Sequence, residues 1–503
     1  MLPSMRNLLF SLLISLLAML SAEEVQVRIL HTSDLHGNLQ GSAEAPASLL
    51  QLSSEVKRAR AECPPHSVLL IDTGDTMQGS LPALLSRGIA PLAILKAMGC
   101  DAWIPGNHDF DYGFDAFLSA AEFMRPNILC GNLQPRSSAY ANYPAWRLYD
   151  CNGARIAVIG ATASYMPHWF LNFSQAFDLQ SAAAMLRRIL PEILSAKPDA
   201  IVLALHQGWL EQDARKVNEV QQISREFPEI DLILGAHTHR PFAGRSIGSH
   251  TWYVQPGAHG EFFSQVDLKI DTAKHIVTEI SSKLIRVSPD APKDPKAEAA
   301  VAQWVQQAAA LGKEVVSAPL PAAISAKGRP GIGCAQSEML CQAIAEASGC
   351  EIALHGILAK ISLEKGEVVT REKLFQIIPY ENTIVTCELT PAELERILSE
   401  QWTLRKVYTF CGLWGATAQV GEKHSRLLSI GISKEAVDPR KRYRVALNSH
   451  TAAGGGRTPV LTEILQNPAA HATDTGISTR EALEQWFRNH PDTVVTPQVW
   501  MKN

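Results

Sequence analysis

The first half of the chain repeats one pattern, in which a short run of aliphatic residues ends in a cluster of polar side chains. Runs of this length, rich in Val, Ile and Leu, predict buried β-strands. The predicted strands, each with the polar residues that follow it, are Val25–Leu30 with Asp34 and His36, Val68–Ile71 with Asp72 and Asp75, Asp101–Ile104 with Asn107 and His108, Ile201–Leu205 with His206, and Leu232–Leu234 with His237 and His239.

Segments in which apolar residues recur with helical spacing lie between these strands. They are Ala47–Ala61, Leu81–Met98, Phe114–Phe123 and Ala182–Leu194. The alternation of strands and helices predicts an α/β fold in which helices cover a largely parallel sheet system. Because sites in such folds form where the carboxyl ends of strands meet, we expect the polar clusters to converge.

A break in composition at Pro289–Pro295 separates this half from a second region. Proline-rich segments of this kind are typical of linkers, and the Ala-rich stretch Lys296–Leu311 predicts a connecting helix. The second region is also expected to be α/β. Its predicted helices are Ser337–Ala347 and Pro391–Gln401, and its predicted strands are Glu351–Leu354, Thr383–Glu388 and Tyr443–Leu447.

Composition and charge limit the partners. The 503 residues are 46% hydrophobic and carry a formal net charge of -4, as in ordinary globular proteins. This balance gives no basic surplus for nucleic acid or an anionic membrane, and it indicates no oligomeric state. An anionic substrate would therefore be bound by local charge or by metal ions.

Residues 1–22 have the layout of a secretory signal peptide, with Arg6, the apolar run Leu8–Leu20 and the small residues Ser21 and Ala22. We expect cleavage near Ala22 and a secreted or periplasmic protein. A membrane anchor is the alternative, but the run is short for a bilayer span. No later stretch is apolar for long enough, so no stable membrane span is expected.

The nine cysteines form no CxxC pair, which argues against a thiolate zinc site. We expect most of them to be buried as small apolar side chains. Some could pair in an oxidising compartment, but the odd number leaves at least one thiol unpaired.

The strand ends supply two carboxylates, one amide and four imidazoles: Asp34, Asp75, Asn107, His36, His206, His237 and His239. One metal ion does not need seven ligands, whereas two divalent cations bridged by a carboxylate do. Oxygen and nitrogen donors without thiolates suit Mn, Zn, Fe, Co or Mg. Two such ions can turn a bound water into hydroxide and neutralise a phosphoryl group during attack, which predicts hydrolysis of phosphoric esters.

His108 follows Asn107 directly, and Asp111 is close enough in the sequence to orient the His108 imidazole. We interpret His108 as the group that stabilises or protonates the leaving oxygen. The alternative for this turn is a polar loop that caps the next helix, and single histidines are commonly structural. The agreement of five strand ends favours a metal site.

The blocks Asp34-Leu-His36-Gly, Gly74-Asp75, Gly106-Asn-His-Asp109, His206 and Gly235-Ala-His237-Thr-His239, in this order, resemble the calcineurin-like metallophosphoesterases. The whole mature chain resembles the secreted 5′-nucleotidase family, which includes periplasmic UDP-sugar hydrolases and ecto-5′-nucleotidases. This implies a four-layer α/β/β/α metallophosphoesterase sandwich and a second α/β substrate-binding domain. The implied boundaries are 1–22 for the signal peptide, 23–288 for the catalytic domain, 289–314 for the linker and connecting helix, and 315–503 for the 5′-nucleotidase-type C-terminal domain.

The resemblance also implies a role for each residue of the site. One metal would be held by Asp34, His36, Asp75 and His239, and the other by Asp75, Asn107, His206 and His237. Asp75 would bridge the two ions. His108 and Asp111 match the family's catalytic dyad, and Asn107 is counted with them as catalytic.

The second half departs from the family's pattern at the implied substrate site. The substrate-binding candidates are Arg329, Lys360, Tyr380 and His450. Lys360 stands where the family has a phosphate-binding Arg, and lysine keeps the charge but loses the bidentate fork. Tyr380 and His450 stand where the family has two stacking Phe residues, and Gly456 replaces an Asp that contacts the nucleoside.

Together these patterns predict an exported, dinuclear-metal hydrolase of phosphoric esters, with a 5′-nucleotide as the leading substrate by resemblance. The departures at the substrate site leave a nucleotide-sugar pyrophosphatase, a cyclic-nucleotide phosphodiesterase and a thiosulfate-releasing hydrolase open. A metal-containing binding protein is the alternative outside the enzyme class. Missing catalytic ligands would favour that alternative, and none is missing from the sequence.

Overall fold

The computed structural model describes residues 24–41, 45–138, 141–165, 173–211, 218–328, 333–403, 411–421, 424–431, 434–455 and 458–497. The expected signal peptide, Arg329 and Gly456 lie outside these residues. The chain forms two compact units, the first mainly from residues before 303 and the second mainly from residues 303–503. Each unit has its own hydrophobic core.

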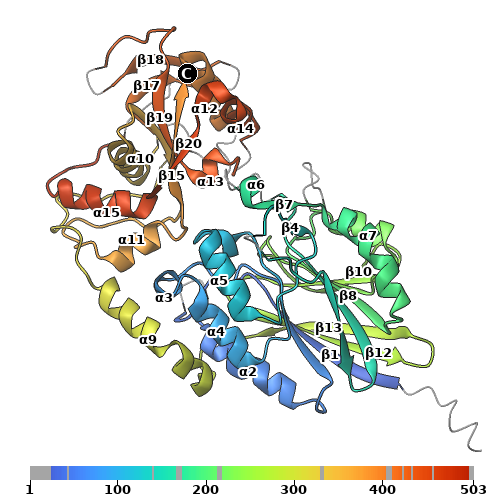
Figure 1. The fold of residues 1–503 in the computed structure, drawn as a ribbon. Coiled ribbons are helices and arrows are strands. Elements are labelled where there is room, and N and C mark those ends of the chain that lie inside the picture. The colour runs from blue at the N-terminus through green and yellow to red at the C-terminus, as the bar shows by residue number, and fades with distance from the viewer. Residues whose placement is uncertain are drawn as a thin grey trace, which may run out of the picture. The chain divides into compact units, whose positions relative to one another are not determined.

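The first unit contains two β-sheets that face each other (Figure 1). The first sheet has the order β13-β12-β1-β2-β3, and the second has the order β10-β11-β9-β8-β6-β5. The first sheet consists of β1 (Glu24–Thr32), β2 (Val68–Asp72), β3 (Ala102–Trp103), β12 (Phe262–Asp271) and β13 (Ile276–Arg286). The second consists of β5 (Trp146–Cys151), β6 (Ala154–Ala161), β8 (Ala200–Leu205), β9 (Leu232–Leu234), β10 (Pro241–Ile247) and β11 (Thr251–Pro256).

Apolar side chains fill the space between the two sheets. Ile29 and Ile71 of the first sheet share this core with Val202 and Leu234 of the second. Because side chains alternate along a strand, the neighbouring residue Leu203 points to the other face, where it packs with the residues of α7.

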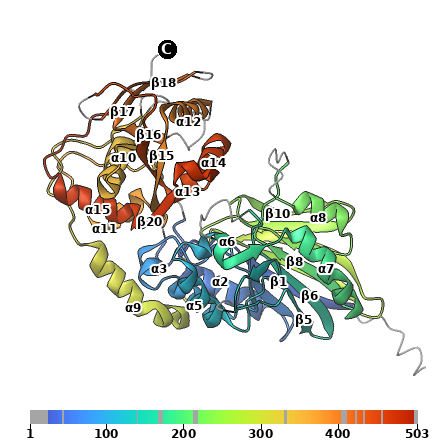
Figure 2. The same cartoon turned by 45° about the horizontal axis from the view of Figure 1, so that its top comes forward.

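Helices cover the outer faces of both sheets (Figure 2). On the side of the first sheet lie α2 (Leu49–Ala61), α4 (Ile89–Met98) and α5 (Phe114–Met124), and on the side of the second lie α7 (Ala182–Ser195) and α8 (Val220–Glu226). The layers are therefore helix, sheet, sheet and helix, which confirms the predicted four-layer sandwich. A small separate pairing joins β4 (Leu133–Pro135) to β7 (Phe177–Leu179), next to the short helix α6 (Phe173–Ala176).

The single helix predicted over Leu81–Met98 is wrong, because this segment forms two helices, α3 (Leu81–Leu85) and α4. Arg87 and Gly88 between them have φ values of 48° and 89°, in the left-handed region that ends a helix. A Cβ on Gly88 would lie 2.4 Å from the Cε atom of Met77, so the position also needs a residue without a side chain. Apolar residues continue on both sides of the break, and the periodicity alone does not reveal it.

The second unit is built around one mixed sheet with the order β16-β14-β19-β15-β20. Its strands are β14 (Ile352–Gly356), β15 (Thr383–Leu389), β16 (Cys411–Trp414), β19 (Tyr443–Asn448) and β20 (Thr473–Ser478), and a two-stranded sheet pairs β17 (Ala416–Gln419) with β18 (Arg426–Ile430). The helices from α9 onward are α9 (Pro295–Gly312), α10 (Ala335–Ser348), α11 (Arg371–Ile377), α12 (Pro391–Thr403), α13 (Ser449–Ala452), α14 (Pro459–Gln466) and α15 (Thr479–Asn489). The second region is α/β, as predicted.

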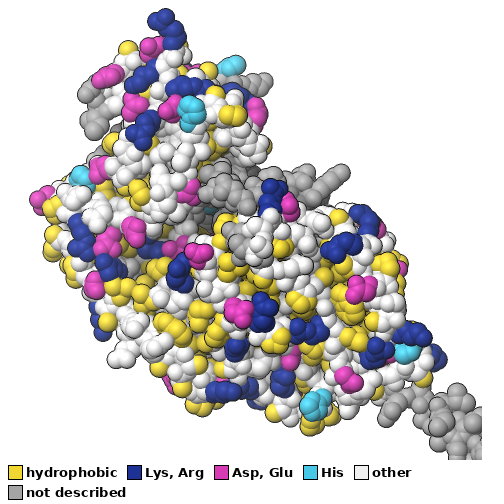
Figure 3. Space-filling model, in the orientation of Figure 1, with side chains coloured by type: hydrophobic (Ala, Val, Ile, Leu, Met, Phe, Trp, Pro, Cys, Tyr) yellow, Lys and Arg dark blue, Asp and Glu magenta, His cyan; other side chains and the backbone are white. Residues whose placement is uncertain are grey.

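The surface agrees with the nearly balanced charge of the sequence. On the face seen in Figure 3, basic and acidic side chains of the described residues are interspersed without a broad field of either sign. None of the helices in the described ranges is long and apolar enough to cross a membrane.

The cysteines behave as the sequence predicts. Of those whose side chains the structure describes, all except Cys63 are buried, and none forms a disulfide. Burial raises the pKa of the Cys130 thiol to about 12 and that of Cys151 to about 12, so these groups are uncharged at neutral pH.

Candidate metal centre

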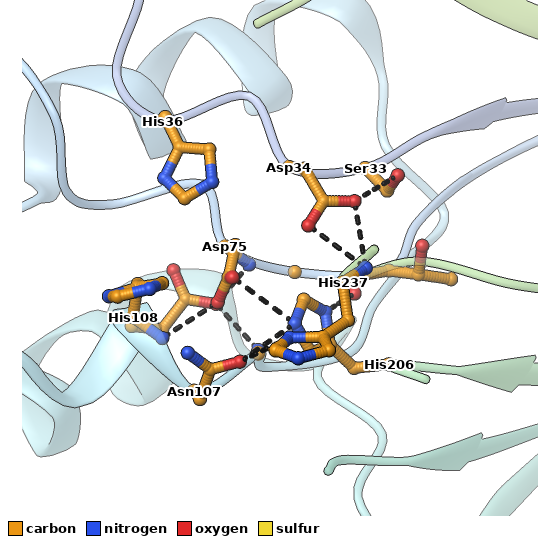
Figure 4. Close-up of polar contacts among 12 residues, drawn as sticks. Ser33, Asp34, His36, Asp75, Asn107, His108, His206 and His237 are labelled. Carbon is orange, nitrogen blue, oxygen red and sulfur yellow. Dashed lines mark hydrogen bonds and ion pairs between the residues drawn. The ribbon is translucent and has the colours of Figure 1, made fainter. Parts of the chain in front are cut away.

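Polar side chains that follow five strands of the first unit meet where the strands end (Figure 4). The parallel pairs β1/β2, β2/β3 and β8/β9 point their carboxyl ends in common directions. The loops after β1 and β2 stay paired beyond the strands, because Asp34 N donates to Gly74 O at 2.8 Å and His36 N donates to Asp75 O at 2.9 Å. The side chains that meet are Asp34, His36, Asp75, Asn107, His206, His237 and His239.

Three of these residues form a first cluster, Asp34, His36 and His239, whose ligand atoms all lie within 4.8 Å of one another. The Nε2 atoms of His36 and His239 face each other at 3.0 Å. His239 Nε2 is also 3.5 Å from Asp34 Oδ1. Asp34 is fully buried, whereas 41% of the His239 side chain is exposed, so the cluster opens to solvent on the His239 side.

Asp75, His206 and His237 form a second cluster, with ligand atoms again within 4.8 Å of one another. His206 Nε2 lies 3.2 Å from Asp75 Oδ2. The amide oxygen of Asn107 lies between the two imidazoles, 3.1 Å from His206 Nε2 and 3.0 Å from His237 Nδ1. The two clusters are joined by backbone, since His237 N donates to both carboxylate oxygens of Asp34 at 3.0 and 3.1 Å.

The tautomer of His206 is set by its backbone partner. His206 Nδ1 donates to the carbonyl oxygen of Thr73 at 2.6 Å, because a carbonyl can only accept. This bond directs Nε2 toward Asp75 and Asn107. A backbone partner on one ring nitrogen with the other turned inward is the usual arrangement of a metal-binding histidine.

The burial of the histidines favours the form that binds metals. Burial, with the charges of neighbouring groups, lowers the pKa of His36 and of His237 well below the ordinary value and lowers the pKa of His239 to about 4. These imidazoles are therefore neutral near pH 7, with lone pairs available to a cation. For His206, burial lowers the pKa but the Asp75 charge outweighs it, and the pKa rises to about 9.

The residues present fit two divalent cations. Two groups of three His and Asp side chains lie within ligand distance, and Asn107 adds an oxygen to the second. Asn107 Nδ2 is buried without a hydrogen-bond partner within the described residues, and the buried Asp75 Oδ2 has the His206 ring at 3.2 Å but no well-aligned hydrogen bond. A carboxylate oxygen buried in this way calls for a positive partner, and the donor set of oxygen and nitrogen suits borderline or hard metal ions.

His108 and Asp111 form a hydrogen-bonded pair beside the second cluster. His108 Nδ1 donates to Asp111 Oδ2 at 2.8 Å, and His108 N donates to Asp75 Oδ1 at 2.7 Å. Burial lowers the pKa of His108, but the charges of Asp111 and Asp75 and the Asp111 hydrogen bond outweigh it and raise the pKa to about 10. The imidazole is thus held as a cation that can donate a proton from Nε2.

Asp109 holds together two loops that present residues of the site, a role that the sequence did not reveal. Its fully buried carboxylate accepts hydrogen bonds from four backbone N–H groups, those of Asp75, Thr76, Met77 and Gly106, at 2.9, 2.9, 2.8 and 2.7 Å. These groups belong to the loops after β2 and β3. One carboxylate therefore fixes the two loops that present Asp75 and Asn107.

Replacing Asp109 with alanine should lower the free energy of unfolding of the metal-free protein by about 3 kcal/mol or more, because buried N–H groups lose their acceptor. Denaturant unfolding of the chelator-treated protein measures this change. Glu122→Ala is the matched control, since 71% of the Glu122 side chain is exposed, and it should change the value by less than about 0.5 kcal/mol. Equal stability of the two variants would contradict the bracing role of Asp109.

Six residues at the site adopt the left-handed backbone conformation, which residues with a Cβ rarely adopt. They are Asp34, His36, Asp75, His237, His239 and His259, with φ between 44° and 71°. In this conformation a side chain leaves the loop in a direction that an extended strand end does not allow. Such strain concentrates at functional sites and is held by the surrounding structure.

His259 is the functional candidate that sequence reasoning missed. It lies in the turn between β11 and β12, and its ring is 5.3 Å from the ring of His36 and 6.0 Å from that of His239, measured between centroids. The sequence does contain a sign of this residue. The segment Gly-Ala-His-Gly follows the apolar residues Tyr253–Val254, as the other polar clusters follow their apolar runs.

The substrate-binding candidates of the second unit lie at one edge of its sheet. Lys360 follows β14 and His450 follows β19, and these two strands are parallel neighbours. Tyr380 precedes β15, which runs antiparallel to β19 and pairs Ile384 with Asn448. All three candidates are exposed.

His450 has a defined position within this edge. A Cβ on Gly455 would lie 2.3 to 2.4 Å from three atoms of the His450 ring, so the imidazole rests directly on the backbone there. Tyr380 is held through its backbone, since its carbonyl oxygen accepts from Arg480 Nη2 at 3.2 Å. Arg329 lies outside the described residues.

Comparison with family models covers both units. Residues 27–241 match the model described as calcineurin-like phosphoesterase, and residues 315–463 match the model of the 5′-nucleotidase C-terminal domain.

Curated relatives match along most of the chain. Protein UshA of Yersinia enterocolitica is 22% identical, over 92% of this chain and 91% of the relative. The trifunctional nucleotide phosphoesterase protein YfkN of Bacillus subtilis is 24% identical over 89% of this chain, which spans only 33% of that relative. Among solved structures, a putative 5′-nucleotidase from Staphylococcus aureus shares the fold, with a TM-score of 0.78, 20% identity, and coverage of 95% of this chain and 99% of that one.

Proposed function

Because the chain belongs to the 5′-nucleotidase family, with a calcineurin-like phosphoesterase domain followed by a 5′-nucleotidase C-terminal domain, we propose that it is an exported hydrolase that uses two divalent metal ions to release phosphate from 5′-nucleotides. Membership in this family makes it a phosphoesterase. The substrate, the ions and the role of each residue are part of the proposal.

One observation carries the proposal: two ligand clusters lie side by side, with the hydrogen-bonded pair of His108 and Asp111 next to them. The ligands proposed for one ion are Asp34, His36, Asp75 and His239, and those for the other are Asp75, Asn107, His206 and His237. Asp75 is proposed to bridge the two ions, since it belongs to the second cluster and its charge also acts on His36 and His239 of the first. When bound, the two ions would activate a water for attack and neutralise the phosphoryl oxygens.

The side chains around the ions would complete the reaction. His108 would protonate the leaving oxygen of the ester from Nε2, because Nδ1 is engaged with Asp111. Asp111 would hold the ring in this orientation and keep it protonated. Asn107 turns its oxygen toward the ion ligands, and Figure 4 shows its amide nitrogen on the side of His108, where it could donate to a phosphoryl oxygen.

The second unit is proposed to select the substrate. Lys360 supplies a positive charge for a phosphate group, and Tyr380 and His450 supply flat rings for a nucleobase. Arg329 is proposed as a second phosphate-binding group. A cyclic-nucleotide phosphodiesterase, a nucleotide-sugar pyrophosphatase and a thiosulfate-releasing hydrolase are alternatives within the same chemistry, and a metal-containing binding protein is the alternative without it.

Export is proposed from the sequence of residues 1–22, in which one basic residue precedes a short apolar run and small residues. Cleavage near Ala22 would start the mature chain at Glu23. N-terminal sequencing of the protein recovered from the cell envelope or the medium tests this step.

In the decisive experiment, the purified, Mn-loaded mature protein is given AMP, UMP, UDP-glucose, cyclic AMP or an aryl phosphate as substrate. The products formed from each compound are then separated and identified. We expect the nucleoside monophosphates to be hydrolysed with a kcat/KM at least about tenfold above that of the aryl phosphate, because nucleoside contacts add binding energy. Preference for UDP-glucose or cyclic AMP would select one of the alternative enzymes. No product from any of these compounds, with two ions bound, would contradict the hydrolase.

A further inference from the structure

His259 occupies a fixed position at the edge of the first cluster. Its backbone N–H donates to the carbonyl oxygen of Asp34 at 2.7 Å, and its own carbonyl oxygen accepts from Asn38 Nδ2 at 2.9 Å. These contacts tie the turn between β11 and β12 to the loop that presents Asp34 and His36. The backbone of His259 is left-handed, with a φ of 58°, like that of five of the seven proposed metal ligands.

The ring of His259 lies beside the cluster without belonging to it. It is near the rings of both His36 and His239, at 5.3 and 6.0 Å between centroids. The three residues whose ligand atoms lie within 4.8 Å of one another are nevertheless Asp34, His36 and His239. His259 is only half-buried, and it adjoins the partly exposed His239, so its ring lies at the solvent side of this cluster.

We propose that His259 donates a hydrogen bond to a phosphoryl oxygen of the bound ester. It is therefore a substrate-binding residue, whereas His108 has a different role and serves the leaving oxygen. The proposal rests on the proposed function. An anionic group held by ions near His36 and His239 would present an oxygen toward the solvent side, where the His259 ring lies. The anchored backbone keeps the His259 ring beside the cluster before the ester binds, so little conformational freedom is lost when the hydrogen bond to the phosphoryl oxygen forms.

A bond of this kind has a distinctive kinetic effect. It would be made to the phosphate of the substrate, of the transition state and of the released product alike. Its loss should therefore raise KM and weaken the binding of inorganic phosphate, with little change in kcat. Loss of His108 should instead lower kcat, because His108 serves the leaving oxygen only as the bond breaks.

Three substitutions separate hydrogen bonding from structure. His259→Phe keeps a flat ring and removes the donor, and His259→Gly removes the ring and the backbone strain together. His259→Asn keeps an N–H donor, and asparagine tolerates the left-handed conformation. The control is His66→Asn, since His66 is an exposed histidine with a φ of 61° that is not among the ligand clusters.

The measurements are metal content by mass spectrometry, binding of inorganic phosphate by calorimetry, and steady-state hydrolysis of an aryl phosphate and AMP. We expect all variants to retain two ions. His259→Phe and His259→Gly should bind phosphate about tenfold more weakly and show a KM about tenfold higher, with kcat within about threefold of wild type. His259→Asn should recover most of the phosphate affinity, and His66→Asn should match wild type.

Phosphate affinity in His259→Phe and His259→Gly equal to that of wild type would overturn the proposal. So would loss of metal in these variants, which would make His259 a support of the ligands, or equal weakening in His259→Asn. Failure of the proposed function looks different, because the wild-type protein itself would then form no product from any ester.

Discussion

Replacing Asp75 with asparagine should lower kcat/KM on the order of a thousandfold and leave the protein with fewer than two bound ions. Asp75 is fully buried, lies within ligand distance of His206 and His237, and also accepts from His108 N at 2.7 Å. Asparagine keeps the shape but removes the negative charge that two cations would share. The stabilisation that two ions give to a phosphoryl transition state amounts to several kcal/mol, which corresponds to a factor of this size.

The measurement for Asp75→Asn is hydrolysis of the best substrate together with the metal content of the same sample. Asp231→Asn is the matched control. Asp231 precedes β9, and its carboxylate accepts a hydrogen bond from Ile201 N at 2.8 Å. It therefore lies at the end of the strand away from the cluster residues. This control should retain both ions and activity within about threefold of wild type. An Asp75→Asn protein with two ions and full activity would refute the bridging role.

Replacing His108 with alanine should reduce kcat by about a hundred- to ten-thousandfold while both ions remain bound, because a positioned acid contributes this much and the ring is not a proposed ligand. The distinction from Asp75→Asn is the metal content. Rapid phosphate-release assays and mass spectrometry of the loaded protein measure the two quantities. Activity unchanged in His108→Ala would refute the acid role.

Asp111→Asn tests the same dyad through pH. The Asp111 charge and hydrogen bond help to raise the pKa of His108 to about 10, against the effect of burial. Since the protonated ring is the donor, activity should be present below the pKa of His108 and lost above it. Removing the Asp111 charge lowers that pKa, so the alkaline limb of the kcat profile should move to lower pH than in wild type. Bound cations lower the pKa in both proteins, and the comparison between them keeps its sign. Superimposable profiles would contradict the pairing.

The architecture and the convergence of the polar side chains could be predicted from the sequence, because both follow from strong local patterns. Aliphatic runs that end in Asp34, Asp75 or His206 place these residues at the carboxyl ends of strands, and parallel strands bring such ends together. No detail of side-chain packing is needed for this step. The same reasoning explains why Lys360 and His450 lie at one edge of the second sheet, since β14 and β19 are parallel neighbours.

Other features depend on contacts between distant segments, and the sequence pattern does not contain them. Asp109 braces two loops through four backbone N–H groups, a role that needs the three-dimensional positions of both loops. For His259 the sequence shows a turn after apolar residues but not its neighbours. It lies 223 positions after His36, and the pairing of β12 with β1 brings the two residues together. The break after α3 places Gly88 so close to Met77 that a Cβ would not fit there, a contact that the helical periodicity does not show.

The left-handed backbone at Asp34, His36, Asp75, His237, His239 and His259 has a consequence for laboratory evolution. Each such conformation costs roughly 1 kcal/mol or more in a residue with a Cβ, so the six together approach the roughly 5–15 kcal/mol by which a whole domain is stable. Glycine at any of these positions would relieve that cost while removing the functional side chain. A library screened for thermal resistance alone should therefore enrich glycine at these positions, and glycine at the five proposed metal ligands among them should give inactive proteins. A screen that also demands turnover would retain those five residues and gain its resistance elsewhere in the chain.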